Sequence, residues 1–308
     1  MAPPRRDTRI PSHGEQLAAY VYLPDEVPGA MPCVVMAHGF SATRDDGLPE
    51  YAEAFQRAGF AVILFDYRHF GASTGEPRQL LDIGRQQQDY RAVIDWARRT
   101  DGIDPDRIVL WGSSFSGGHV LAVAATDPRI AAVISQAPFT DSIAVIRRLP
   151  VRNLLRGSVA ALADHAATLL GRAPRLIPAV GPPGTFAVMT AADAQPGFGA
   201  ITGPDTLWRN EVTARIMLGV AGYRPVRYAR RLAMPVLFCV CDEDTTTPPG
   251  PSVKAAHAAP RGELRRYPYG HFAIYHDPQV KADQVEFLLR VIMGEEDARR
   301  GADSEIGG

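Results

Sequence analysis

The sequence predicts an α/β protein with a doubly wound, mostly parallel sheet, interrupted by an inserted and mainly helical segment. Short runs made almost wholly of apolar residues alternate with helical stretches in the first half of the chain. This is the pattern of parallel strands that are covered on both faces. The alternation stops near residue 141 and resumes near residue 231. One sheet with a single long insertion accounts for both observations.

The first 140 residues contain most of the predicted sheet. A pattern that turns near His13-Gly14 indicates an antiparallel hairpin. The apolar runs that follow it are predicted to be buried strands, and the stretches between them have the apolar spacing or the glycine stop of helices. In chain order, the hairpin covers 8–23, strands cover 33–39, 61–66, 107–111 and 131–135, helices cover 49–58, 82–99 and 117–126, and a turn at 104–106 precedes the third strand.

The insertion contains no obvious buried parallel strand, and the core pattern returns after it. Because ligands bind outside the carboxyl ends of the strands in such sheets, an insertion after the fourth core strand is expected to cover the site. We predict a core from residues 1–140 and 231–293, a cap from residues 141–230 (the cap segment) and a flexible tail, 294–308. Helices are predicted at 143–155, 159–170, 207–217, 250–259 and 278–293, strands at 235–240 and 263–267, and a glycine- and proline-rich stretch at 173–204.

Composition excludes several classes of protein. The 308 residues are 46% hydrophobic and carry a net charge of −1, which is unlike a disordered chain and gives no sign of a nucleic-acid or membrane partner. Three cysteines, Cys33, Cys239 and Cys241, are too few for a disulfide scaffold and are predicted to be buried, reduced thiols. No run has the length of a transmembrane helix, and the first residues lack the apolar core of a signal peptide. We therefore expect a cytoplasmic protein and leave a homodimer open.

The sharpest signal is the sequence Gly-Ser-Ser-Phe-Ser-Gly-Gly at 112–118, between a predicted strand and a helix of small residues. A serine on such a tight turn stands clear of the sheet, and the helix N-terminus favours developing negative charge. Ser114 is therefore the candidate nucleophile, flanked two residues away by Gly112 and Ser116. Ser116 departs from the usual second glycine, but it is small enough to let the turn close. A phosphate-binding loop is disfavoured because its glycine spacing and lysine are absent.

A serine nucleophile needs a base and an acid that orients the base. The strand predicted at 235–240 ends in an acidic cluster, in which Asp244 is the candidate acid and Asp242 the alternative. His271 follows the last predicted strand and a glycine, and is the candidate base. His276 is the alternative, expected to open the final helix, and His257 is expected to lie on a helix surface.

The order serine, aspartate, histidine along the chain is that of the α/β-hydrolases, and the sequence resembles this family. The likeness covers about 220 residues, everything outside the cap segment. Residues 38–40, His-Gly-Phe, resemble the family's oxyanion segment, and residues 66–73 resemble its D-x-R-G-x-G-x-S loop. His69 replaces a glycine of that loop, and Cys241 stands where a glycine often precedes the acid. Within the family, the likeness is greatest to dienelactone-hydrolase-like and peptidase-like esterases.

The resemblance implies an α/β-hydrolase sheet and a serine hydrolase that cleaves ester or thioester bonds of a small molecule through an acyl-enzyme. It further implies that the backbone N–H groups of Phe40 and Phe115 form the oxyanion hole, with His38 a framework residue. No cofactor or metal is implied. The alternatives are an acyltransferase, lyase or cyclase of secondary metabolism with the same triad, a peptidase-like amide hydrolase, and a binding protein that has lost the chemistry.

The cap segment carries an uneven charge, with eleven arginines and five acidic residues. One interpretation is a positive rim that attracts an anionic substrate, and the other is a solvated surface that reflects the arginine-rich composition of the whole chain. Pro182 and Pro183 suggest a mobile access loop. Apolar residues expected to line an acyl pocket are Leu154, Leu155, Phe186, Phe198, Trp208 and Met217.

Overall fold

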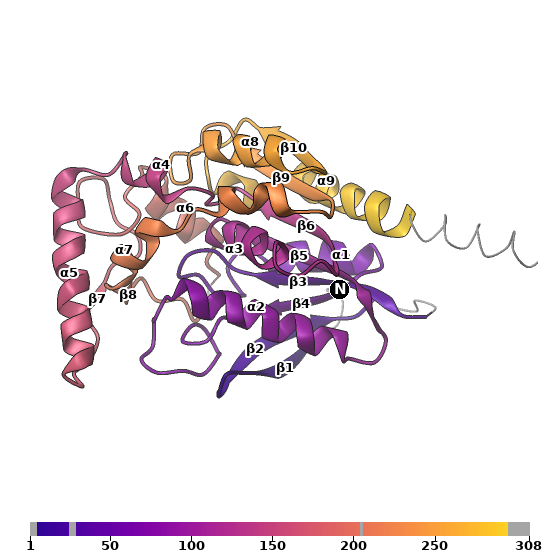
Figure 1. Cartoon of the computed structure of the whole chain (residues 1–308), viewed down its shortest axis with the longest axis horizontal. Coiled ribbons are helices and arrows are strands. Elements are labelled where there is room, and N and C mark those ends of the chain that lie inside the picture. The colour runs from indigo at the N-terminus through magenta and orange to yellow at the C-terminus, as the bar shows by residue number, and fades with distance from the viewer. Residues whose placement is uncertain (1–4, 25–28, 204–205, 295–308) are drawn as a thin grey trace, which may run out of the picture.

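A computed structural model describes residues 5–24, 29–203 and 206–294. Its centre is an eight-stranded sheet in the order β1-β2-β4-β3-β5-β6-β9-β10 (Figure 1). The six strands from β4 to β10 are parallel, whereas the hairpin β1–β2 joins β4 in antiparallel pairing. The predicted α/β-hydrolase sheet is thereby confirmed. The strands are β1 (Arg5–Ser12), β2 (Glu15–Tyr22), β3 (Met31–Ala37), β4 (Ala61–Phe65), β5 (Ile103–Ser113), β6 (Ile130–Gln136), β9 (Val236–Cys241) and β10 (Gly262–Tyr267).

Helices cover both faces of this sheet, because its central strands are apolar on both sides. Val34 and Met36 belong to the apolar cluster that contains α1 and α9, whereas Val35 belongs to the cluster that contains α2, α3 and α8. This alternation is the two-residue period of a strand. The covering helices are α1 (Pro49–Arg57), α2 (Ile83–Arg98), α3 (Phe115–Ala124), α8 (Pro249–Ala258) and α9 (Pro278–Leu288), with the short turns η3 (Ala273–Tyr275) and η4 (Leu289–Met293) near the end.

The register of the parallel strands sets where the functional loops emerge. Ala37 pairs with Gly112, and Ser113 pairs with Gln136, so β3, β5 and β6 end at the same edge of the sheet. The loops after these strands and after β9 therefore lie side by side.

The cap segment lies beyond this edge, at the left of Figure 1. Its longest helix, α5, forms the outermost layer, and a two-stranded antiparallel sheet, β7–β8, lies beside it. Its elements are α4 (Ser142–Ile146), α5 (Val151–Leu169), β7 (Leu176–Ile177), α6 (Ala194–Ile201), β8 (Val212–Thr213), α7 (Ile216–Gly219), η1 (Val220–Gly222) and η2 (Pro225–Arg231).

Two predictions for the cap segment are wrong. The helices expected at 143–155 and 159–170 are instead α4 and one long α5, because Pro150 has no N–H to continue α4 and starts α5 instead. The helix expected at 207–217 is replaced by an irregular stretch, β8 and α7. There the Asn210 side chain bonds both to the N–H and to the C=O of Val180, and β8 pairs with β7. These tertiary contacts override the local helical pattern.

Smaller differences lie elsewhere. β5 begins at Ile103 rather than after a turn at 104–106, with a register shift opposite β3. α6 was not expected, because its sequence contains proline and glycine. All three cysteines are buried and free, as expected. Within the described ranges, no helix combines the length and apolar character needed to cross a membrane. The predicted tail lies outside the described residues from 295 onward.

Candidate active site

Ser114 sits on a strained turn between β5 and α3. Its backbone has φ 57° and ψ −116°, a conformation rarely adopted by residues other than glycine. Gly112 is needed for this turn, because a Cβ there would come within 2.3 Å of the Ser116 carbonyl oxygen. The turn leads directly into α3, so the serine lies at the N-terminal end of a buried helix.

The side chain of Ser116 explains why serine is accepted in place of the usual glycine. Its Oγ donates to the His38 carbonyl oxygen at 2.5 Å and is hydrogen-bonded to the Tyr67 hydroxyl. These bonds connect the turn to the loop after β3. The departure from the family pattern therefore adds a connection within the site instead of disrupting it.

Hydrogen bonds connect Ser114, His271 and Asp244. The Ser114 Oγ lies 2.9 Å from His271 Nε2, and His271 Nδ1 lies 2.6 Å from an Asp244 carboxylate oxygen, Oδ2. All three residues are buried, with exposed fractions of 7%, 2% and 3%. With the proton on Nδ1 donated to Asp244, Nε2 is free to accept the serine proton.

The Asp244 carboxylate is held in place by the turn that follows it. Its Oδ1 accepts the N–H groups of Thr246 and Thr247 at 2.8 and 2.6 Å, and its Oδ2 accepts the Thr247 hydroxyl at 2.7 Å. Sequence analysis did not identify Thr247. The signal was present, because an aspartate followed at close range by threonine often folds into a turn in which the carboxylate accepts backbone N–H groups.

The alternative residues lie elsewhere. Asp242 is exposed and pairs with Arg266 at 2.7 Å, so it faces away from His271. His276 is exposed just before α9, whose capping side chain is Asp277, and His257 is exposed in the last turn of α8.

The loop after β3 lies against the serine turn. A Cβ on Gly39 would stand 3.0 Å from the Ser114 Cβ, so glycine permits this close approach. The next residue, Phe40, packs edge-to-face on Phe115 with ring centroids 5.5 Å apart. Phe115 is the first residue of α3, and its N–H is one of those that a helix leaves without a partner in the helix.

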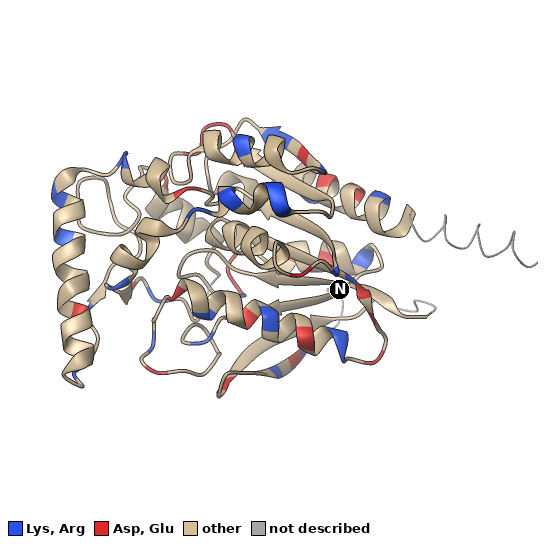
Figure 2. Cartoon of the chain, viewed as in Figure 1, with Lys and Arg blue, Asp and Glu red and all other residues tan. Residues whose placement is uncertain are grey.

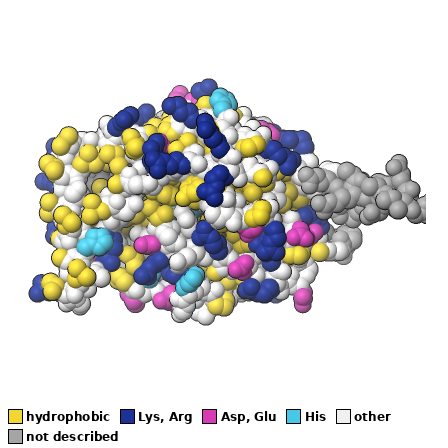
Figure 3. Space-filling model, viewed as in Figure 1, with side chains coloured by type: hydrophobic (Ala, Val, Ile, Leu, Met, Phe, Trp, Pro, Cys, Tyr) yellow, Lys and Arg dark blue, Asp and Glu magenta, His cyan; other side chains and the backbone are white. Residues whose placement is uncertain are grey.

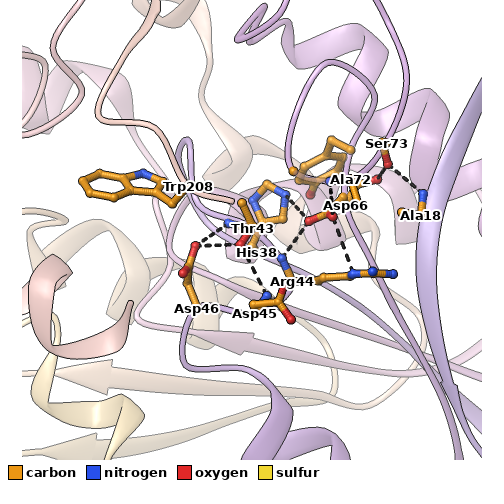
Figure 4. Close-up of polar contacts among 12 residues, drawn as sticks. Ala18, His38, Thr43, Arg44, Asp45, Asp46, Asp66, Ala72, Ser73 and Trp208 are labelled. Atoms are coloured by element: carbon orange, nitrogen blue, oxygen red, sulfur yellow. Dashed lines mark hydrogen bonds and ion pairs between the residues drawn. The ribbon is translucent and has the colours of Figure 1, made fainter. Parts of the chain in front are cut away.

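A buried polar network around Asp66 holds this loop in place (Figure 4). The Asp66 carboxylate accepts the N–H groups of Arg44 at 2.7 Å and Ala72 at 3.0 Å, and lies 3.6 Å from the Arg44 guanidinium. Burial raises the pKa of Asp66 to about 7 despite these bonds. Burial also lowers the pKa of His38, at 3.9 Å from Asp66, to about 4, so this histidine is neutral near pH 7. His38 has the framework position that the family resemblance implies.

The position where His69 replaces the family's glycine keeps a glycine-like backbone. His69 has φ 73°, and its ring Nε2 lies 3.1 Å from an Arg85 guanidinium nitrogen. Two residues on, Gly71 is tightly packed, because a Cβ there would reach within 2.3 Å of Asp66. The loop at 66–73 thus keeps its shape around Asp66.

A second carboxylate, Asp46, joins the loop to the cap segment. It accepts the N–H and hydroxyl of Thr43 at 2.7 and 2.9 Å, and the hydroxyl of Thr206 at 2.6 Å. The N–H of Trp208 bonds in turn to Thr206, and the Trp208 ring stacks on Phe198 at 4.7 Å. Figure 4 shows Asp46, Thr43 and Trp208 beside the Asp66 network.

Ser114 opens onto an apolar cavity of about 70 Å³ between the core and the cap segment. A wider groove of about 390 Å³ shares part of this lining and carries Arg148 at its side. Ser114 also lines a small recess, together with His271, Asp46 and Phe198 among others. Residues from the cap segment that line the cavity are Ser142, Val145, Ile146, Leu149, Val188, Met189, Ile216, Met217 and Val220.

The predicted pocket residues are only partly brought together. Met217 lines the cavity and Phe198 the recess, with Trp208 stacked behind it. Leu155 was wrongly placed, since it is 64% exposed on the outer side of α5. The cap segment's part of the lining comes mostly from α4, α7 and the segment around Met189, whose apolar residues lie in short or irregular stretches that gave no clear sequence pattern.

The sheet topology and this serine, histidine and aspartate arrangement define an α/β-hydrolase. The crystal structure of alpha/beta hydrolase GrgF from Penicillium sp. sh18 is similar to the chain, with a TM-score of 0.82 over 94% of this chain and 99% of that one. At 24% sequence identity, this likeness shows the fold alone.

The chain belongs to the S15 peptidase family. The family model described as "X-Pro dipeptidyl-peptidase (S15 family)" matches residues 13–173, just over half of the chain. Quorum-quenching protein AidA of Acinetobacter baumannii (strain MDR-ZJ06) is 43% identical over 290 residues, covering 93% of this chain and 95% of AidA. Thiohydrolase aneE of Aspergillus aculeatus is 35% identical over 174 residues, covering 56% of this chain and 52% of the relative. Polyketide transferase grgF of Penicillium sp. is 35% identical over 170 residues, covering 54% and 56%.

Proposed function

We propose that the protein is a serine hydrolase that cleaves carboxylic ester or thioester bonds of a small molecule through an acyl-enzyme. One observation carries this proposal: Ser114, which is hydrogen-bonded to His271 and through it to Asp244, lines an apolar cavity. A polar cluster that served only to stabilise the fold would not require an apolar cavity beside its serine, whereas an acyl-enzyme does.

The geometry supports the following steps. His271 Nε2 takes the proton of Ser114 as Oγ attacks the acyl carbonyl carbon, and Asp244 stabilises the imidazolium that forms. The N–H groups of Phe40 and Phe115 donate to the oxyanion, and each such donor contributes about 2.7–4 kcal/mol to catalysis. His271 then protonates the leaving alcohol or thiol as its bond to the acyl carbon breaks. Water, deprotonated by His271, releases the acid and restores Ser114.

The cavity and the groove suggest how the substrate lies. The acyl chain fits the cavity beside Ile216 and Met217, and the leaving group extends into the groove beside Arg148. A guanidinium there favours a leaving group or acyl tail that carries negative charge. The mechanism itself uses only residues of this chain and requires no metal or organic cofactor.

Acyl transfer is the second candidate, favoured by the groove and by the relative named as a polyketide transferase. A groove of about 390 Å³ has room for an alcohol or thiol acceptor in place of water at the acyl-enzyme. The distinction between the two reactions lies in which nucleophile reaches the Ser114 ester first.

A panel of p-nitrophenyl esters and acyl thioesters of increasing chain length tests the proposal, with Ser114→Ala as the blank. We expect wild-type turnover with a chain-length optimum, and none above background for the variant. Val220→Phe, which shortens the cavity, should lower kcat/KM for the longer acyl chains and leave acetyl esters unchanged. Equal turnover by wild type and blank would reject the hydrolase, and ester products formed with an added alcohol would favour transfer.

We also propose a cytoplasmic location. Cys33, Cys239 and Cys241 are buried as free thiols, and burial raises the pKa of each of them. Cys239 and Cys241 lie two residues apart on β9, so their side chains point to the same face of the sheet. Reduced thiols in such numbers suit a reducing compartment. Comparison of cell fractions with an antibody or a tag would test the location.

A further inference from the structure

An ordinary surface helix buries its large apolar residues and exposes its polar ones, whereas helix α5 does the opposite. Its buried residues are small or polar: Asn153, Gly157, Ala160, Ala161 and Asp164. Its large aliphatic residues point outward, and six of the eleven exposed large hydrophobic residues in the described chain lie on α5 or directly after it. These six are Val151 (70%), Leu155 (64%), Val159 (66%), Leu162 (61%), Leu169 (87%) and Leu170 (65%), and we name them the α5 stripe.

The inward face explains why the helix is nonetheless held in place. Gly157 lies so close to Met217 that a Cβ would come within 2.7 Å of its methyl carbon. Asp164 accepts the guanidinium of Arg215 at 2.6 Å and the N–H groups of Arg175 and Arg215. The helix is thus anchored by close packing and one ion pair, and the α5 stripe is not needed to hold it.

The surroundings of the α5 stripe are basic. Arg147, Arg148, Arg152, Arg156, Arg172 and Arg175 are all exposed, whereas the single acidic residue between positions 142 and 175 is the buried Asp164. Figure 2 draws basic positions near both ends of α5, and Figure 3 shows hydrophobic side chains with basic ones beside them at the left end of the molecule.

We propose that the α5 stripe and the arginines around it dock on an anionic lipid surface. A helix with an aliphatic face bordered by arginines binds in the plane of a membrane by burying that face and attracting anionic lipid headgroups. A second copy of this chain fits less well. Two α5 helices would bring Arg152, Arg156 and Arg172 of both copies together, and residues 142–175 contain no exposed acid to compensate.

The position of α5 gives this docking a consequence for the substrate. Leu149 and Pro150 line the groove that adjoins the cavity at Ser114, and Val151 begins the α5 stripe immediately after them. A docked helix therefore places the mouth of the groove at the lipid surface. An apolar acyl substrate dissolved in the membrane would reach the groove without crossing bulk water. This consequence rests on the proposed hydrolase function, whereas the docking itself does not.

Sedimentation with vesicles tests the docking. We compare vesicles of phosphatidylcholine alone with vesicles in which one-third of the lipid is phosphatidylglycerol. Wild type should bind the anionic vesicles and lose most binding in high salt. The double variant Leu155→Asp/Leu162→Asp should lower the partition coefficient by at least about tenfold. Arg156→Gln/Arg172→Gln should lower it roughly 30-fold, since each arginine near an anionic surface contributes about 1 kcal/mol.

Matched controls lie at the other end of the molecule. Leu289→Asp changes an exposed leucine and Arg261→Gln an exposed arginine outside the cap segment, and both should bind as wild type does. Turnover of a short water-soluble ester should be unchanged in every variant, because none of these residues lines the cavity or the groove. This readout separates failure of docking from failure of the proposed function.

Two outcomes would overturn the proposal. One is an absence of wild-type binding to anionic vesicles, or binding that the two double variants do not reduce. The other is self-association of wild type in analytical ultracentrifugation that Leu155→Asp/Leu162→Asp abolishes, which would assign the α5 stripe to a dimer.

Discussion

Helices α3 and α5 are both rich in alanine, valine and leucine, yet they meet opposite surroundings. Every residue of α3 is buried, between the sheet on one side and α2 and η2 on the other. On α5 the small residues are buried and the large ones are exposed. Apolar composition alone therefore does not show which helix lies at the centre of the fold, because burial depends on which other elements pack against it.

The same contrast separates what the two regions do. Helix α3 fixes Ser114 within a core that tolerates little change: Gly117 and Gly118 each lie so close to a neighbour that a Cβ would come within 3.0 Å. The cap segment supplies the cavity walls and an outward surface, and it depends on a few polar contacts. Changes in the core should therefore affect chemistry, and changes in the cap segment should affect access.

The largest effect is expected in the core. Ser114→Ala should lower kcat by about 10⁶-fold, as loss of a triad nucleophile does in other enzymes. The melting temperature should not fall, because alanine, like serine, has a Cβ and so adds no strain at the φ of 57°. A fluorophosphonate probe should label Ser114 alone. Labelling of Ser113 or Ser116 would mean that the turn has been misassigned.

The second test compares two neighbouring carboxylates. Asp244→Asn should lower kcat by about 10⁴-fold, because the amide no longer fixes the imidazole tautomer. Asp242→Asn should leave kcat within about twofold, since it removes only an exposed pair with Arg266. Steady-state kinetics of both variants on one ester decide the point, and equal losses would reject Asp244 as the orienting acid.

The third test is directed at the cap segment. Asp164→Asn weakens the hydrogen bonds to Arg215 and should destabilise the packing of α5 by about 1.5–3 kcal/mol. Hydrogen exchange should accelerate in α5 and β7 but not in β3, β5 or α3. Glu211→Gln, which changes the pair between half-buried Glu211 and exposed Arg209 in the same segment, is the matched control. Accelerated exchange in the core as well would show that the two regions unfold as one.

The smallest effect concerns pH and the junction of the two regions. Burial lowers the pKa of His119 to about 3 and that of His38 to about 4. Both are neutral in the folded protein, so their contribution to stability is complete above the unfolded pKa of about 6.5 and is lost as pH falls below it. Between pH 8 and pH 5, each should lower the free energy of unfolding by about 2 kcal/mol.

When urea unfolding is measured at both pH values, the change in the free energy of unfolding between pH 8 and pH 5 should differ by about 2 kcal/mol between His119→Gln and wild type. His119 contacts Tyr223 of the cap segment at 2.7 Å and Gln86 of α2 at 2.9 Å. The exposed His257 provides the control, and His257→Gln should behave as wild type. A pH dependence that survives His119→Gln unchanged would place the titrating group elsewhere.

The core was predictable because its signals are local. The runs that became β3, β4 and β9 are continuous and apolar. Small residues two positions before and two positions after Ser114 form a spacing that few local structures other than this turn require. The departure at His69 was noted but not explained from the sequence, and the structure gives this residue a positive φ of 73°, a conformation that favours glycine.

The cap segment was less predictable because its structure depends on distant contacts. Asn210 forms its hydrogen bonds with Val180, and Arg215 forms its ion pair with Asp164, which are 30 and 51 residues away. The outward face of α5 was misjudged for the same reason. Apolar spacing shows that a helix has an apolar side, but nothing in the sequence shows whether the fold provides a partner for it.

The bond between Asp46 and Thr206 limits how this protein can be recombined with its relatives. Asp46 belongs to the loop that carries Phe40, and Thr206 belongs to the cap segment. A chimera that exchanges residues 141–230 for a segment without a hydroxyl at position 206 would leave buried Asp46 with one hydrogen-bond donor missing, in the recess that Ser114 also lines. Chimeras designed to change the substrate range should therefore exchange the loop at 38–46 and the cap segment together.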